Sequence, residues 1–534
     1  MRKKLLRLSS LIIFVFIFLA YRVFKVQQNM MEKDNKSNIQ KEIISDSKGL
    51  LLDEKGENLL DYKKEYYLVI DEKPFRLNDP RTFLDDLLAF SYIVKSDNPD
   101  FSLEEIFKNG EKEYIKISEN TYYKLKEIKN IKGIYTFSKD VTEKKEAWKI
   151  ENLLGNYYNE VEDKGKIKKD LKPLGTLERT IYEYIKDNEF PNVKFSLDNN
   201  AIYTLSKIDD ESKNINIKTT LDNQWQSKIR EVLNDPKYSN LENAGVVLVE
   251  SKTGKIKALA QKDEKQVNIL LGGTYGYEPG SIFKILTAEL ALEEGIIKEN
   301  EKIYCDGKNC FRNGKSHAHG SIDLETAMKV SCNVFFQKLA MKIGYNDLYN
   351  FAKNQGVFSK VLGFQDERIG EADLNGGVTN FSIGQSIVTT PLQMVSLLST
   401  VVNDGTYVKP YIIDSILDED NNTVKVFSSE DNKKVINEQT ARKVKKDMKA
   451  VVETGSGYNA KIKGIDIGGK TGTANGNNKD YGTFLGYFNI ENQYYNMMVF
   501  VPGIEGKNAE GEEMVGGNTA APIFKDVISS ITKK

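Results

Sequence analysis

Two residues near the middle of the chain, Ser281 and Lys284, have the types and the spacing that acyl transfer by a serine requires. The surrounding stretch GYEPGSIFKILTAELALEEG opens with Pro-Gly and continues as an apolar-periodic run, which predicts a helix with Ser281 in its first turn. Side chains three residues apart on a helix project from one face. A lysine among apolar neighbours can have its pKa lowered enough to accept the proton of a serine hydroxyl. The pair therefore predicts a nucleophile and its general base.

Two further motifs follow, first S-x-N and then K-T-G, in the order described for serine enzymes that react with penicillin. Ser331-Cys332-Asn333 lies between two helical stretches, and Lys470-Thr471-Gly472 ends a strand-like stretch. Each motif alone is a weak signal, because S-x-x-K recurs from Ser45 and from Ser530, and K-T-G recurs from Lys252. The order and setting of the three motifs together predict one catalytic site.

The stretch GIDIGGKTGTA, residues 464–474, also satisfies the phosphate-binding pattern G-x-x-x-x-G-K-[ST]. A phosphate loop must open a helix, whereas the residues after Thr471 read GTANGNNKDYG and are poor helix formers. ATP binding is therefore not predicted. Nucleic-acid binding is not predicted either, because 76 basic residues are balanced by 77 acidic ones without a long basic run.

Strand-like segments flank a mostly helical stretch in the C-terminal half. GVVLVE and KIKALAQ form a predicted hairpin after Ala244, three more strand candidates lie in KIKGIDIGGKTGTA, TFLGYFN and YYNMMVFVPG, and FKDVISSITK is a closing helix. Strands at both ends imply one sheet assembled from distant segments, with helices on its faces. The predicted fold class is α+β. Before this body, a strand-rich region begins near Lys48, and residues 80–190 have a mostly helical pattern.

The N-terminus predicts a membrane anchor. Basic residues precede the apolar run LSSLIIFVFIFLAY, which Val23 and Phe24 extend past Arg22. An uncleaved signal anchor over 8–26 is favoured over a cleaved signal peptide, because no small-x-small cleavage site follows. Residues 1–7 are then a cytoplasmic tail, and the rest of the chain lies on the extracytoplasmic side of the cell membrane.

Cysteine and histidine residues are few and follow no recognised metal-binding pattern. Cys305 and Cys310 end the loop CDGKNC, where a disulfide is sterically possible and two unpaired thiols fit the sequence equally well. With His317 and His319 the order is C-x4-C-x6-H-x-H, which is not a familiar zinc spacing. The sequence predicts no metal and no cofactor.

The motifs and their surroundings resemble the class B penicillin-binding proteins, anchored peptidoglycan D,D-transpeptidases of the penicillin-binding protein 2 and division transpeptidase type. The similar segments are HGSIDLETAMKVSCNVFFQKLAMKIG, FSIGQSIVTTPLQM, VVETGSGYNAKIKGIDIGGKTGTA and GGNTAAPIF, preceded by KGLLLDEKGENLL, LGTLERTIYEYI and KTTLDNQWQ. The resemblance implies a transpeptidase domain over 241–534, with an antiparallel sheet and helices on its faces. It also implies an elongated pedestal or dimerisation domain over 27–240, although Lys48 and Glu54-Lys55 stand where that family usually carries arginines.

The resemblance further implies a role for each motif residue. Ser281 attacks the penultimate D-Ala carbonyl of a stem peptide and expels the terminal D-Ala, while Lys284 accepts the serine proton. Ser331 relays a proton toward the leaving amine, and Asn333 hydrogen-bonds the amide of the donor peptide. An acceptor amine then resolves the acyl-enzyme as a cross-link, and β-lactams acylate the same serine.

The K-T-G strand is implied to bind the substrate. Lys470 and Thr471 hold the substrate carboxylate, and the strand edge through Gly472 and Thr473 pairs with the peptide as an added strand. The glycines that match the phosphate-binding pattern, Gly464 and Gly469, are interpreted as clearance for this peptide. The backbone N–H groups of Ser281 and Thr473 form the oxyanion hole.

The implied partners are peptidoglycan stem peptides ending in D-Ala-D-Ala, β-lactam antibiotics and a membrane glycosyltransferase of the SEDS class. A D,D-carboxypeptidase side activity belongs to the same chemistry. A β-lactamase or a β-lactam sensor uses the same serine constellation and is the alternative function, but neither needs a pedestal. A scaffold without activity is disfavoured because Ser281, Lys284, Ser331 and Lys470 are all intact.

Overall fold

The computed structural model describes residues 18–19, 21–22, 25, 39–103, 112–163, 166–209, 214–312, 315–430, 432–475, 480–508 and 511–533. The chain forms two compact units, each built from separate segments. The first unit comprises Met1–Gly49, Asp61–Glu143 and Asn188–Asn214. The second unit comprises Leu50–Leu60, Lys144–Asp187 and Ile215–Lys534, and it carries all of the predicted catalytic residues.

The first unit contains two three-stranded antiparallel sheets, ordered β4-β3-β5 and β1-β8-β9. Its elements are β1 (Ile39–Ile43), β3 (Tyr62–Asp71), α2 (Glu72–Phe75), α3 (Pro80–Lys95), β4 (Lys112–Ile117), α5 (Glu119–Lys126), β5 (Ile134–Thr142), β8 (Asn192–Leu197) and β9 (Tyr203–Asp209). Alternation along β3 buries both faces of this strand: Leu68 and Ile70 pack in one apolar cluster with Phe90, and Val69 packs in another with Phe195.

The central sheet of the second unit is five-stranded and antiparallel, in the order β12-β11-β25-β24-β23. Its strands are β11 (Gly245–Glu250), β12 (Ile256–Gln261), β23 (Ile467–Asn475), β24 (Asp480–Ile490) and β25 (Gln493–Ile504). The predicted hairpin and the three later strand candidates are therefore confirmed, and so is the α+β class. The sheet joins the two ends of this region because β11 pairs with β25.

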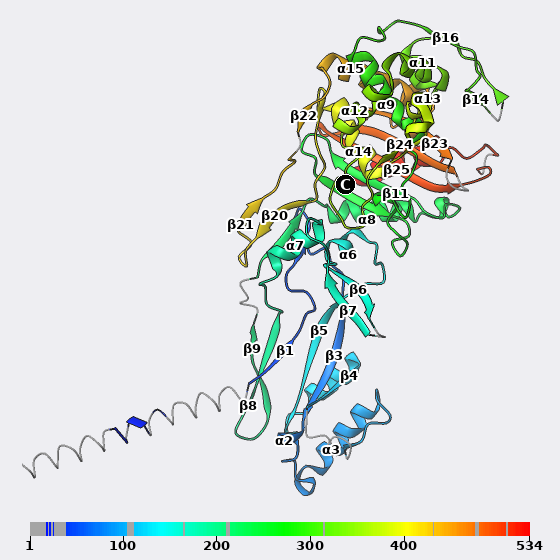
Figure 1. Cartoon of the computed structure of the whole chain (residues 1–534). Helices are drawn as coiled ribbons and strands as arrows, with labels where there is room; N and C mark the ends of the chain where they lie inside the picture. The colour runs from blue at the N-terminus through cyan, green and yellow to red at the C-terminus, as the bar shows by residue number, and fades with distance from the viewer. Residues whose placement is uncertain are drawn as a thin grey trace, which may run out of the picture. The chain divides into compact units, whose positions relative to one another are not determined.

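Helices cover both faces of this sheet (Figure 1). Residues of β11 alternate between the two faces: Val246 and Leu248 pack in a cluster with α8 (Asn223–Leu233) and α16 (Ala520–Thr532), and Val247 and Val249 pack in the larger cluster that contains α9 and α14. The remaining helices of this unit are α6 (Ile150–Leu154), α7 (Leu177–Ile185), α9 (Lys284–Glu293), α10 (Leu324–Lys329), α11 (Asn333–Ile343), α12 (Tyr345–Asn354), α13 (Gly377–Phe381), α14 (Pro391–Val402) and α15 (Glu438–Thr454).

A second, four-stranded sheet explains why early residues belong to the second unit. β2 (Leu51–Leu52), β10 (Asn216–Thr219), β20 (Ile413–Leu417) and β21 (Thr423–Val426) lie in that order. The pairing of β2 with β10 brings residues near position 50 beside this body. The two compact units therefore differ from the predicted division at 240/241, because parts of 27–240 pack with the later residues.

The expected helical pattern over residues 80–190 is wrong in part. This region contains β4 and β5, and also the hairpin of β6 (Tyr158–Asp163) with β7 (Lys166–Leu171). The stretch KEYIKI of β4 alternates polar and apolar residues, and pairing with β3 decides its conformation.

Most of the predicted anchor over 8–26 and the whole tail 1–7 lie outside the described residues. Within the described ranges, no helix has the length and apolar character needed to cross a membrane.

Candidate active site

Ser281 lies in a 3-10 turn, η3 (Gly280–Phe283), that leads directly into α9. The predicted helix is confirmed, with its first turn tightened. Gly280 has a φ of +58°, and its N–H donates to the Gly384 carbonyl at 2.9 Å, which holds the turn in place. A Cβ at Gly280 would lie 3.0 Å from the Thr473 carbonyl oxygen, so β23 passes close beside the serine.

Lys284 directs its ammonium group at the Ser281 hydroxyl. Nζ lies 3.0 Å from Ser281 Oγ, and the i, i+3 prediction is therefore confirmed. The same nitrogen lies 2.8 Å from the Ser331 carbonyl oxygen, 3.1 Å from Ser331 Oγ and 2.5 Å from Asn333 Oδ1. The side chain is completely buried, and burial lowers the pKa of Lys284 to about 7. A large fraction of this amine is then neutral at physiological pH and able to accept a proton.

Ser331 occupies the turn between α10 and α11 in a strained backbone conformation. Its φ is +54°, in the left-handed region that non-glycine residues rarely adopt. Cys332, the next residue, is the N-cap of α11, and its Sγ accepts a hydrogen bond from the Phe335 N–H at 3.4 Å. This turn brings the Ser331 hydroxyl and the Asn333 amide to the same lysine.

Lys470 also contacts the Ser331 hydroxyl. It is fully buried on β23, and its Nζ donates to Ser331 Oγ at 2.8 Å and to the Thr471 carbonyl at 3.0 Å. Burial, and then the charge of Lys284, lower the pKa of Lys470 well below its usual value. Among the described residues no carboxylate forms an ion pair with Lys470. A substrate carboxylate at this position would therefore supply the missing counter-charge.

β23 is an edge strand of the five-stranded sheet, paired on one side with β24. Its next residue after the lysine, Thr471, shares a hydrogen bond of 2.7 Å with Ser456, which no sequence motif indicated. A Cβ at Gly472 would lie 2.2 Å from Thr483 Oγ1 and 3.2 Å from the Pro279 carbonyl, so only glycine fits between β24 and the serine turn. Thr473 is exposed beyond it. The absence of a side chain at Gly472 therefore allows the close approach of the protein's own serine turn.

These groups form a chain of hydrogen bonds suited to moving a proton. Ser281 Oγ, Lys284 Nζ, Ser331 Oγ and Lys470 Nζ follow one another at 3.0, 3.1 and 2.8 Å. A proton leaving Ser281 can reach Lys284 and then the Ser331 hydroxyl. The arrangement can perform acyl transfer through a serine ester.

The model of the family described as "Penicillin binding protein transpeptidase domain" matches residues 244–529. The chain belongs to the penicillin-binding protein transpeptidase family. The resemblance of the sequence to class B penicillin-binding proteins is thereby confirmed. The family match begins at β11 and ends within α16, so it spans the whole central sheet of this penicillin-binding protein.

Curated relatives match somewhat more than half of the chain. The chain is 28% identical over 356 residues to stage V sporulation protein D of Bacillus subtilis, covering 59% of this chain and 53% of that protein. It is 27% identical over 347 residues to penicillin-binding protein PbpB of Mycobacterium tuberculosis, covering 58% and 50%. The chain thus spans about half the length of these relatives.

Two solved structures share the fold. Penicillin-binding protein 2X of Streptococcus thermophilus superposes with a TM-score of 0.69 at 18% identity, covering 92% of this chain and 80% of that chain. Penicillin-binding protein 3 of Mycobacterium tuberculosis, complexed with ampicillin, superposes with a TM-score of 0.59 at 18% identity, covering 92% of this chain and 95% of that chain.

Proposed function

We propose that this penicillin-binding protein is a peptidoglycan D,D-transpeptidase that acts through an acyl-enzyme at Ser281. One observation carries the proposal: the buried amine of Lys284 lies 3.0 Å from Ser281 Oγ and 3.1 Å from Ser331 Oγ. A base between the nucleophile and a second hydroxyl is what an ester-forming and ester-breaking serine enzyme needs.

In the first half-reaction Ser281 Oγ attacks the carbonyl carbon of the penultimate D-Ala. The O–C bond forms, the serine proton passes to Lys284, and the tetrahedral oxyanion is held by backbone N–H groups of Ser281 and Thr473. Collapse breaks the C–N bond, and Ser331 delivers a proton to the leaving D-Ala amine. An acceptor amine then repeats these steps in reverse and releases Ser281 with a new amide bond.

Substrate recognition is proposed for the K-T-G strand. Lys470, which lacks an ion-pair partner among the described residues, binds the terminal carboxylate together with Thr471. The stem peptide adds as a strand along the free edge of β23. Asn333, whose Oδ1 atom accepts a hydrogen bond from Lys284 Nζ, is proposed to bind the donor amide.

We also propose a membrane anchor, a pedestal and a partner for this protein. The apolar run after the basic N-terminus supports an anchor over 8–26, with the catalytic unit on the extracytoplasmic side. The first compact unit supports a pedestal role for part of 27–240. A membrane glycosyltransferase of the SEDS class is the proposed partner, and its recovery with the full-length protein from membranes tests that assignment.

Labelled penicillin tests the chemistry. Wild-type protein should form a long-lived covalent adduct on Ser281, and Ser281→Ala should form none. Ser45→Ala, which alters another S-x-x-K serine, is the matched control and should label like the wild type. An adduct on another residue would contradict the proposal, and an adduct that turns over rapidly would support the alternative β-lactamase function.

A further inference from the structure

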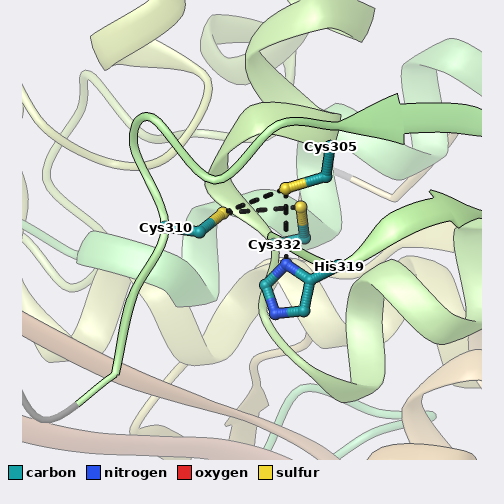
Figure 2. Close-up of side chains that lie close together, drawn as sticks. All are labelled: Cys305, Cys310, His319 and Cys332. Carbon is teal, nitrogen blue, oxygen red and sulfur yellow. Dashed lines mark hydrogen bonds between the residues drawn. The ribbon is translucent and has the colours of Figure 1, made fainter. Parts of the chain in front are cut away.

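All three cysteines of the chain and one histidine meet beside the S-x-N turn (Figure 2). Cys305 ends β13 (Ile303–Cys305), Cys310 lies in the following loop, and Cys332 caps α11. His319 directly precedes β16 (Gly320–Ile322), which pairs with β13. Cys332 completes a ligand set that the spacing of the other three residues did not indicate.

Three distances within this cluster are close to those of a tetrahedral zinc site. Cys305 Sγ lies 3.7 Å from Cys310 Sγ and 3.4 Å from His319 Nδ1, and Cys310 Sγ lies 3.6 Å from Cys332 Sγ. The four ligand atoms all lie within 4.8 Å of one another. Zinc bonds of about 2.3 Å to sulfur and about 2.0 Å to nitrogen place tetrahedral ligand atoms about 3.5 to 3.8 Å apart.

The sulfur atoms are not arranged as a disulfide. Each thiol is free and buried, and the sulfur separations of 3.6 and 3.7 Å are far longer than a covalent S–S bond, which is about 2.0 Å. In Figure 2 the three sulfur atoms and the imidazole point toward a common centre. Three thiolates and one imidazole form a soft donor set that favours zinc over magnesium or calcium.

Hydrogen bonds within the protein hold the loop of Cys310 in place. The His317 N–H donates to the Cys310 carbonyl at 2.8 Å, which folds the loop back on itself. Asn333 Nδ2 donates to the Asn309 carbonyl at 2.9 Å, and Asn309 Nδ2 donates to Gln337 Oε1 at 3.0 Å. The loop that carries Cys310 is therefore fixed against the start of α11.

We propose that Cys305, Cys310, His319 and Cys332 bind one zinc ion. Four protein ligands fill a tetrahedral shell, so the ion has a structural role and leaves no open position for substrate. Binding to three neutral thiols releases three protons and leaves three thiolates on the metal.

The site is coupled to the catalytic residues through the chain itself. Cys332 stands between Ser331 and Asn333, and both of these neighbours contact Lys284 Nζ. A metal bond to Cys332 Sγ fixes the backbone that presents the Ser331 hydroxyl in its strained conformation. The ligands are thus positioning residues for the proposed acylation, whereas metal binding itself does not depend on that function.

The first test measures metal directly in the full-length protein purified under reducing conditions. Mass spectrometry of the intact protein and elemental analysis should give one zinc per chain. Cobalt substitution should give the visible spectrum of tetrahedral cobalt with thiolate charge-transfer bands. Cys305→Ser, Cys310→Ser and His319→Ala should each lose most of the metal, and His317→Ala, an exposed histidine two residues away, should keep it. Wild-type protein without zinc and without the cobalt spectrum would overturn the site.

A second test uses wild-type protein and therefore does not depend on the folding of the ligand variants. Chelation of zinc from wild-type protein should lower its melting temperature by several degrees, and zinc should restore it. Chelation should also slow labelling by penicillin about 10- to 100-fold, because Ser331 and Asn333 lose their fixed position. Unchanged labelling after proven zinc loss would overturn the positioning role. Failure of labelling in the zinc-loaded protein would instead contradict the proposed function.

Discussion

Two buried lysines, Lys284 and Lys470, donate to the same Ser331 hydroxyl, at 3.1 and 2.8 Å. Burial disfavours the ammonium form of each, and the charge of one opposes the charge of the other. The site can therefore keep Lys284 neutral as a base and reserve the positive charge for Lys470 once a carboxylate is bound. Lys284 also contacts the Ser281 hydroxyl, which suits the role of a base, whereas Lys470 does not pair with a carboxylate among the described residues and can bind a substrate carboxylate.

The rate of acylation should depend on the protonation of Lys284. Because burial lowers the pKa of Lys284 to about 7, the neutral base is lost as pH falls below 7 and is complete above about 8. The second-order rate constant for labelled penicillin should therefore rise with pH, about tenfold per unit below 7, and then level off. The Lys284→Arg variant should be acylated slowly at every pH, because its guanidinium stays protonated. An acylation rate constant of the wild type that does not change with pH would contradict the role of Lys284 as the base.

At the scale of elements, the K-T-G strand and the serine turn fit together at Gly472. A Cβ there would lie 2.2 Å from Thr483 Oγ1. Gly472→Ala should lower the stability of this unit by about 1–3 kcal/mol and slow acylation, because β23 must move away from Ser281. Chemical unfolding and penicillin labelling measure the two effects.

A double variant separates this contact from a general effect on the strand. Gly472→Ala with Thr483→Ala removes the closest atom and should regain part of the lost stability. The Pro279 carbonyl at 3.2 Å remains, so the recovery should be incomplete. Equal stability of the single and double variants would show that Thr483 is not the limiting contact.

Helix α9 carries a second buried ionisable group, Glu289, on the side away from the reaction. Its Oε1 accepts from Thr400 Oγ1 of α14 at 2.6 Å, and Oε2 accepts from Gln355 Nε2 at 3.1 Å. Burial raises the pKa of Glu289 to about 7. The folded protein then holds this proton more tightly than the unfolded chain, so stability from this group falls as pH rises from about 4.5 to 7.

Glu289→Gln should remove that pH dependence. The variant should gain stability relative to wild type as pH rises from 5 to 8, by on the order of 3 kcal/mol. Gln355 Oε1 is a buried atom without a hydrogen-bond partner among the described residues. If the side-chain amide of Gln355 rotates by 180°, this oxygen can accept a hydrogen bond from the side-chain amide that the substitution introduces at position 289. The difference between the two unfolding midpoints, measured at each pH, checks the sign. A constant difference would contradict it.

At the scale of the whole molecule, the segments of the second unit are joined by an ion-pair triad in which both carboxylates are buried. Arg230 of α8 donates to Glu151 Oε2 of α6 at 2.8 Å and to Glu264 Oε1, in the loop after β12, at 3.0 Å. Burial raises the pKa of Glu264 to about 7 in spite of Arg230. Removal of the arginine would leave two buried carboxylates without their cation.

Arg230→Ala should therefore destabilise the second unit by about 3–5 kcal/mol. Both tryptophans of the chain, Trp148 and Trp225, lie in this unit, so their fluorescence reports its unfolding separately from the first unit. Arg442→Ala is the matched control, because Arg442 pairs with Glu438 on an exposed surface, and it should cost at most about 1 kcal/mol. Equal midpoints for the two variants would contradict a structural role for the triad.

The sequence by itself determined the features that depend on near neighbours along the chain. The meeting of Ser281 and Lys284 follows from helical spacing, and the strands around Lys470 follow from alternation. The contact between the proposed nucleophile and its proposed base, and the α+β class, could therefore be predicted. The tertiary structure alone decided which distant segments share a site. Ser456 beside Thr471, the two interleaved units and Cys332 beside Cys310 depend on packing between segments. Local spacing carries no information about such contacts, so the sequence alone does not indicate Cys332, inside S-x-N, as the fourth member of the proposed metal site.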